Sequence, residues 1–172
     1  MSVEKIDRKI SVIFATDVVD YSLHMEKDET GTVTSLRTYE KILKESFRKH
    51  GGRLFNTGGD SFMAEFSSAV KAVECAIDFQ NIVKEKNKNV IKPALSFRIG
   101  INAGDVILQK KNLLGEGVNV AARLEQLSQP GGITISKSIF DYIEGKIDLQ
   151  IEDLGIQQVK KNKFHAFRIF FS

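Results

Sequence analysis

The chain has little of several features that would place it in a special class of protein. Its 172 residues include one cysteine, Cys75, so no disulfide can form within the chain and a reducing cytoplasm fits. No apolar run approaches the roughly 20 residues of a membrane-spanning helix, and the charged start, residues 1–9, contains no signal-peptide core. We therefore expect a cytoplasmic protein with no membrane segment in this chain.

The sequence also lacks a strong charge of either sign. Its net charge is +3, and the acidic and basic residues are interspersed. The longest basic cluster, residues 84–92, is broken by Asn and Glu and is typical of a solvated loop, so we expect no nucleic-acid partner. The length and ordinary composition predict one domain with one sizeable core, spanning residues 1–172.

The spacing of apolar residues predicts both strands and helices. Strands are expected at 10–15, 53–57, 61–66, 95–101, 106–108, 133–135 and in the tail between 147 and 170. Helices are expected at 30–49, after Ser67 and Ser68, at 118–127, and from Ser136. The segment Gly58–Gly59–Asp60 predicts a tight turn between two strands. This order predicts an α+β sandwich with helices on one face of a mainly antiparallel sheet.

Two acidic residues occupy positions typical of metal ligands. Asp17 follows the first expected strand, and Asp60 lies at the tip of the expected hairpin. If these strands are neighbours, both carboxylates meet at one sheet edge, where the Val18 carbonyl could complete a site for octahedral Mg²⁺ or Mn²⁺. Two such ions could activate an attacking oxygen and stabilise a leaving one. Taken singly, each Asp also fits an ordinary turn or helix cap.

A second group of polar residues lies on one expected helix. Asn119 and Arg123 are four residues apart, so they share a helix face. The planar guanidinium of Arg123 suits phosphate oxygens, and Asn119 could orient a ribose. The alternative is that Arg123 is an ordinary surface residue.

Together these pieces resemble a known family. Four segments appear in its order, at residues 14–19, 56–64, 97–104 and 115–125. They resemble the two metal motifs, the central strand with its turn, and the Val-Asn-x-Ala-x-Arg helix of class III adenylyl and guanylyl cyclase catalytic domains, bacterial members above all. The resemblance implies a ferredoxin-like cyclase core and a reaction that converts a nucleoside triphosphate into a 3′,5′-cyclic nucleotide and pyrophosphate for second-messenger signalling.

The resemblance also implies how the site is assembled. The active unit would be a homodimer with sites at the interface, where Asp17 and Asp60 of one chain hold two Mg²⁺ or Mn²⁺ ions. Asn119 and Arg123 of the other chain would position the ribose and stabilise the transition state.

Phosphate binding in such a site involves two further parts of the chain. The turn from Val18 through Val19 and Asp20 to Tyr21 would help bind metal and phosphate. A basic residue near the C-terminus would bind the triphosphate, and the candidates are Lys160, Lys161 and Lys163. The sequence departs from the family at Asp20, where Gly is frequent, and at Asp105, where some relatives have Arg.

The two positions that read the base in purine cyclases hold neutral amides, Asn56 and Asn112. An amide can both donate and accept, so these residues do not specify adenine. ATP is the first expectation because it is common in the family. GTP stays open, as does UTP or CTP, because some small bacterial relatives make cyclic UMP or cyclic CMP as antiviral signals.

Two other functions compete with catalysis by a cyclase of this family. A non-catalytic cyclase-like module could bind nucleotide as a regulator, although loss of one of the four site residues would be expected there. The segment 58–62 also resembles the hairpin signature of diguanylate cyclases. However, the helix with Asn119 and Arg123 does not belong to that family, and its next acidic position is occupied here by Ser61.

Overall fold

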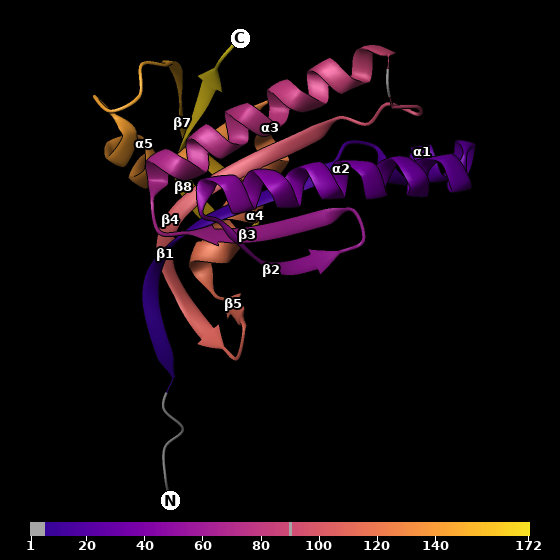
Figure 1. Ribbon diagram of the computed structural model, residues 1–172. Helices are drawn as coiled ribbons and strands as arrows, with labels where there is room; N and C mark the ends of the chain where they lie inside the picture. Colours follow the sequence, from indigo (N-terminus) through magenta and orange to yellow (C-terminus); the bar gives the residue numbers. More distant parts are fainter. Residues whose placement is uncertain (1–5, 90) are drawn as a thin grey trace, which may run out of the picture.

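A computed structural model describes residues 6–89 and 91–172. The elements are β1 (Asp7–Val18), α1 (Tyr21–Lys27), α2 (Glu29–His50), β2 (Arg53–Gly58), β3 (Ser61–Phe66), α3 (Ala69–Asn89), β4 (Phe97–Gln109), β5 (Asn112–Leu114), α4 (Glu116–Leu127), β6 (Ile133–Ser136), α5 (Lys137–Ile143), β7 (Gln150–Val159) and β8 (Asn162–Phe170). The strands form one sheet in the order β2-β3-β1-β4-β6-β8-β7, with β5 paired to β4 (Figure 1). Among the described strands only β4 and β6 pair in parallel, so the prediction of a mainly antiparallel sheet is confirmed.

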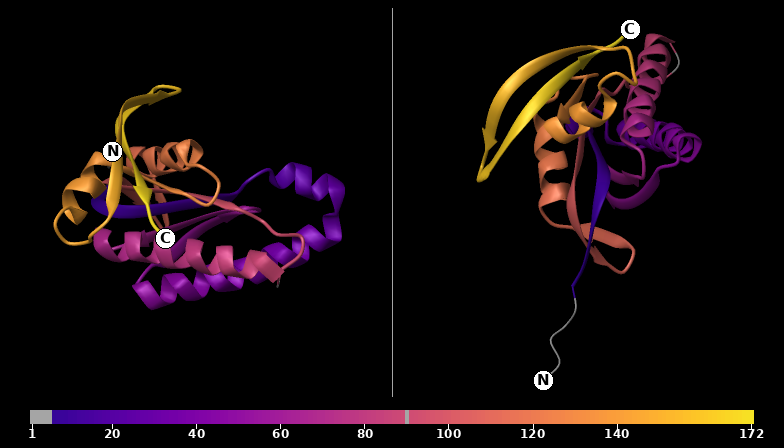
Figure 2. Two further views of the ribbon diagram at one scale, coloured as in Figure 1. Left: turned by 90° about the horizontal axis from the view of Figure 1, so that it is seen from above. Right: turned by 90° about the vertical axis from the view of Figure 1, so that its left-hand side faces the viewer.

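Helices cover both faces of this sheet, whereas the sequence pattern predicted helices on one face. The main core lies between the sheet and α2, α3 and α5, and it includes Val12 and Phe14 of β1. The alternate residues Ile13 and Ala15 are also buried, and they pack against α4 on the other side (Figure 2). A strand buried on both faces reads as a continuous apolar run rather than an alternating one, and β1 has that pattern. The prediction of a one-sided arrangement was therefore wrong for α4.

Several predicted boundaries and caps are confirmed, and others differ. Gly51 ends α2 in the left-handed region (φ 79°), and the side chains of Ser68 and Ser136 accept hydrogen bonds at the starts of α3 and α5. The two strands predicted at 95–101 and 106–108 are one strand, β4. Gly104 lies inside it, and Gly117 of α4 packs closely on that part of the strand: a Cβ on Gly117 would lie 2.7 Å from the Asp105 carbonyl oxygen and 3.1 Å from the Gly104 carbonyl carbon. The short elements α1 and β5 were not predicted.

Gly100 sets how closely α4 approaches β4. A Cβ at this position would lie 2.2 Å from the Glu125 backbone nitrogen and 2.5 Å from the Ala121 carbonyl oxygen. We expect Gly100→Ala to lower the free energy of unfolding by about 3 kcal/mol, because the helix would have to move away from the sheet. Urea unfolding measures this, with Gly58→Ala as the control, since its Cβ would meet only the Ser61 hydroxyl at 3.2 Å. Equal effects of the two substitutions would contradict this account of the contact.

Candidate active site

The antiparallel pairing of three strands brings the predicted metal ligands to one place. Asp17 pairs with Ser61 of β3 on one side and with Arg98 of β4 on the other. The β2–β3 hairpin then turns through Gly59 (φ 69°) and Asp60 directly beyond Ser61. Both acidic residues are half-buried. The structure therefore brings Asp17 and Asp60 together, because the two strands are neighbours, which was the condition attached to the prediction.

The electrostatics of Asp60 show that the two carboxylates affect each other. Burial raises the pKa of Asp60, and the negative charge of Asp17 raises it further. Backbone hydrogen bonds from its own amide and from Val18 act in the opposite direction. Two carboxylates that share a partly buried site favour a cation between them, which would relieve their repulsion.

Arg98 is the first residue of this site that the sequence reasoning missed. Its guanidinium donates two hydrogen bonds to the Asp17 carboxylate, from Nε to Oδ1 at 3.0 Å and from Nη2 to Oδ2 at 2.6 Å. The pair is only partly exposed, at 28% for Arg98 and 18% for Asp17. Bidentate pairing of this kind fixes both position and orientation. Arg98 lay within the segment 97–104 that resembles the family's central strand, and a lone arginine in an apolar strand was the available signal.

Glu125 of α4 is the second residue that was missed. Its side chain is only 8% exposed, and Oε2 lies 3.6 Å from Nη2 of Arg98. Burial raises the pKa of Glu125 to about 8, with the charge of Asp17 adding to this and that of Arg98 opposing it. The helix spacing that singled out Asn119 and Arg123 places Glu125 on a different side of α4, so the motif alone gave no reason to select it.

This donor set fits a divalent cation that completes its shell from elsewhere. Among the residues that the structure describes, no group of three or more His, Cys, Asp or Glu side chains is arranged to hold a metal ion. Asp17 and Asp60 are two carboxylates, and magnesium typically takes one or two from protein while substrate phosphates and waters fill the remaining positions. These two residues would hold the metal, with a main-chain carbonyl such as that of Val18 beside them.

The predicted phosphate-binding turn lies beside the same carboxylates. A cavity of about 500 Å³ is lined by Asp60 and by the first residues of α1, including Tyr21. Asp20 precedes this helix in the left-handed conformation (φ 54°), and Val19 is anchored by its amide to the Ser96 carbonyl at 2.8 Å. A left-handed residue before a helix leaves successive amides pointing outward, an arrangement that suits anions.

Asn119 and Arg123 do not join the carboxylate cluster of their own chain. Glu125, which contacts Arg98, is two residues beyond Arg123, and residues two apart on a helix point in widely different directions. Asn119 is exposed, and the half-buried Arg123 has a buried Nε without a hydrogen-bond partner among the described residues. The single chain thus presents the two predicted halves of a site on different surfaces.

The two predicted base-reading residues lie in β2 and at the start of β5. A β-bulge between Leu54 and Asn56 pairs Asn56 with Met63, whose side chain packs on the α4 side. Bulges re-aim side chains, and this one moves Asn56 off the α2 side that simple alternation would give it. Asn112 lines a cavity with Phe55, the bulged residue, and its Oδ1 accepts from the Leu113 amide at 2.9 Å.

The candidate lysines lie far from the carboxylates along the sheet. Lys160 and Lys161 form the turn between β7 and β8, and Lys163 is the second residue of β8. Lys163 lines a cavity with Asp105, seven residues along β4 from Arg98. The structure therefore does not bring any of them to Asp17 within one chain.

Comparison with known proteins supplies the family. The model of the adenylate and guanylate cyclase catalytic domain matches residues 2–170. A putative adenylate cyclase 3 from Rhizobium meliloti is 41% identical over 162 residues, which is 93% of this chain and 28% of that protein. An uncharacterized protein from Mycobacterium tuberculosis is 30% identical over 126 residues, 71% of this chain and 41% of its own length. The chain thus spans well under half the length of these relatives.

Solved structures of cyclase domains have the same fold as this chain. An adenylate/guanylate cyclase/hydrolase from Silicibacter pomeroyi superposes with a TM-score of 0.89 at 30% identity, covering 98% of this chain and all of that one. The adenylyl cyclase CyaB from P. aeruginosa shares the fold, with a TM-score of 0.83 at 23% identity over 98% of this chain and 97% of its own. Within the described part of the chain, no helix is long and apolar enough to cross a membrane. The ferredoxin-like cyclase core predicted from the four motifs is confirmed, and the chain belongs to the adenylate and guanylate cyclase catalytic domain family.

Proposed function

We propose that the chain is a nucleotidyl cyclase that converts a nucleoside triphosphate, ATP first, into a 3′,5′-cyclic nucleotide and pyrophosphate for signalling in the cytoplasm. The observation that carries this is the assembly of Asp17, Asp60 and Arg98 at one sheet edge. A partly buried pair of carboxylates with an adjacent guanidinium suits a metal-bound triphosphate better than it suits a structural role. Membership of the family supports a cyclase reaction, and so does the chemistry of the residues at the site.

The chemistry that Mg²⁺ or Mn²⁺ would supply, with two ions per site, is activation of the ribose 3′-hydroxyl and neutralisation of charge on the phosphates. The carboxylates of Asp17 and Asp60 would bind these metal ions and fix their positions. The 3′-hydroxyl would release its proton to solvent as its oxygen attacks the α-phosphorus in line, and the bond from that phosphorus to the bridging oxygen would break so that pyrophosphate leaves. Arg98 would be free to donate to phosphate oxygens once Asp17 turns to the metal, because one carboxylate cannot fully serve both partners.

The site is proposed to form between two copies of the chain. Asn119 and Arg123 lie on a different side of α4 from Glu125 and so face away from the carboxylates of their own chain. A two-fold arrangement would place them opposite Asp17 and Asp60 of a second copy, generating two equivalent sites. In that position Asn119 would orient the ribose and Arg123 would stabilise charge in the transition state. The basic turn with Lys160 and Lys163 would reach the triphosphate only across such an interface.

Base selection is proposed to rest on Asn56 and Asn112. The bulge in β2 pairs Asn56 with Met63 on the α4 side of the sheet, and Asn112 begins β5 beside Phe55. Since amides can match several base edges, a pyrimidine triphosphate, UTP or CTP, is the second candidate substrate. A non-catalytic nucleotide-binding module would be expected to lack part of the charged set, and this chain keeps all of it.

The test is an end-point assay of the purified chain with ATP, GTP, CTP and UTP separately. Each is incubated with Mg²⁺ and with Mn²⁺, and products are identified by mass spectrometry, with an inactive Asp60→Asn chain as the blank. We expect one triphosphate to give most of the cyclic product, and we expect that to be ATP. A folded dimer that forms no cyclic nucleotide from any of the four would contradict the proposed function, while product from UTP or CTP would reassign the base.

A further inference from the structure

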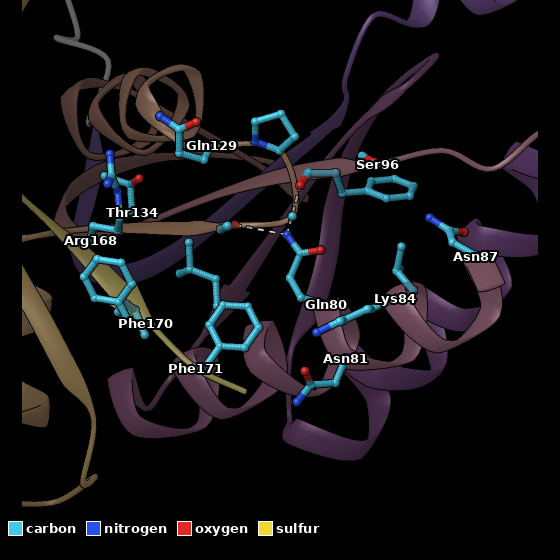
Figure 3. A pocket seen from close by; sticks show the side chains of 17 residues that line it. Gln80, Asn81, Lys84, Asn87, Ser96, Gln129, Thr134, Arg168, Phe170 and Phe171 are labelled. Atoms are coloured by element: carbon cyan, nitrogen blue, oxygen red, sulfur yellow. Dashed lines mark hydrogen bonds between the residues drawn. The ribbon is translucent and has the colours of Figure 1, made fainter.

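A cavity of about 520 Å³ lies beside α3, and Figure 3 shows the side chains that line it. It opens between α3, the start of β4, the loop 129–132 and β8. This volume is within the range that small-molecule sites occupy. None of the residues proposed above for metal, ribose, base or phosphate lines it.

The charge of this cavity is of one sign. Lys84 and Arg168 line it, and none of its described lining residues is Asp or Glu. Lys84 is exposed and forms no ion pair among the described residues, while Arg168 lies 3.4 Å from Glu152, outside the cavity. In Figure 3 the Lys84 ammonium extends toward Gln80 and Phe171 rather than away from the cavity. A cavity with cations and no acidic lining favours an anionic occupant.

The floor of the cavity is rigid and offers a hydrogen-bond acceptor. Gln80 is 4% exposed, and its Nε2 donates to the Phe97 carbonyl at 2.9 Å and to the Gly132 carbonyl at 3.0 Å. These two bonds orient the amide, so its Oε1 is fixed as well. This oxygen accepts no hydrogen bond from the described residues and is available to a donor on a ligand.

Aromatic side chains supply an apolar wall. Phe170, 42% exposed, and Phe171 line the cavity beside Ile169, and both rings lie at its edge in Figure 3. One exposed and one half-buried phenyl ring next to an unpaired cation suit a ligand with an apolar ring and an acidic group.

The cavity adjoins two segments that are connected to the proposed catalytic residues. Phe97 precedes Arg98 in β4, and the two side chains lie on opposite faces of the sheet. The loop 129–132 follows α4, and its Gly131 amide donates to the Phe97 carbonyl at 2.8 Å. A molecule in the cavity would therefore touch the strand that carries Arg98 and the connection that follows Asn119 and Arg123.

We propose that this cavity is an effector site for a small organic anion bearing an apolar ring, with Lys84 binding the acidic group, Gln80 accepting a hydrogen bond, and Phe170 and Phe171 packing on the ring. The site is separate from the substrate site and is positioned to influence it. The proposal concerns binding and stands whether or not the chain cyclises ATP.

The test uses two fluorescent probes with the same ring system. 8-Anilino-1-naphthalenesulfonate carries one sulfonate, and N-phenyl-1-naphthylamine lacks it. Each is titrated against the wild-type chain, Lys84→Gln and Lys88→Gln, where Lys88 lies one turn further along α3, outside the cavity, and pairs with Glu85. We expect one sulfonate probe per chain, bound at least about fivefold more weakly by Lys84→Gln and unchanged by Lys88→Gln.

The uncharged probe should bind the wild-type chain more weakly, and Lys84→Gln should not change its affinity. Equal affinity of the sulfonate probe for Lys84→Gln and Lys88→Gln would overturn the proposal. So would wild-type binding of the uncharged probe that matches that of the sulfonate. Both lysines are exposed, so neither substitution should prevent folding.

Discussion

Replacing Asp60 with asparagine is expected to lower cyclase turnover by at least about a thousandfold, because the loss of one of two metal-binding carboxylates removes several kcal/mol of transition-state stabilisation. The fold should survive. The raised pKa of Asp60 means that its ionised form is disfavoured in the folded chain, so folding free energy is lost as pH rises through that pKa. Asparagine carries no charge, and the metal-free variant should be at least as stable as the wild type at pH 7.

Two measurements check this result, turnover with saturating Mn²⁺ and urea unfolding in the presence of a chelator. Asp148→Asn is the matched control, since Asp148 is exposed and lies outside every part of the proposed site. Asp17→Asn should abolish turnover in the same way, although it also releases Arg98 from its bidentate partner. Near wild-type turnover in Asp60→Asn would show that the carboxylate pair is not the metal site.

Replacing Arg123 with alanine is expected to lower kcat by about a hundredfold to a thousandfold, the usual effect of removing one donor aimed at transition-state charge. The Arg123 side chain is half-buried, and its Nε is buried without a hydrogen-bond partner among the described residues. Steady-state kinetics measure the effect, and Arg37→Ala, an exposed site on α2, is the control. An unchanged kcat would remove Arg123 from the catalytic set.

Mixing this variant with Asp60→Asn gives a sharper test of the shared site. Each heterodimer would contain one site with both defects and one site with neither. An equal mixture that exchanges freely should regain roughly a quarter of wild-type activity, because half of the dimers are mixed and each has one intact site of two. Failure to regain activity, in a mixture shown to contain heterodimers, would mean that each site is built from one chain.

Local signals in the sequence were sufficient for several parts of the structure. Gly58–Gly59–Asp60 forms the tight hairpin it predicted, and the serines before α3 and α5 act as caps, because turns and caps depend on a few neighbouring residues. The sequence predicted that Asp17 and Asp60 would meet if their strands were neighbours, and the pairing of β1 with β3 fulfils that condition. Four motifs in order predicted the family, which comparison confirmed.

Other parts depended on contacts between residues far apart in the chain. The sheet pairing of β1 with β4 and the close approach of α4 over Gly100 decide that Arg98 and Glu125 meet Asp17, and neither could be read from local spacing. The direction in which Asn56 points depends on a bulge that appears only when β2 pairs with β3. By itself, the sequence determined which residue types were present and their local turns, because these are short-range properties. Only the tertiary structure decided which charges became partners, because ion pairing and burial are set by the packing of separate elements.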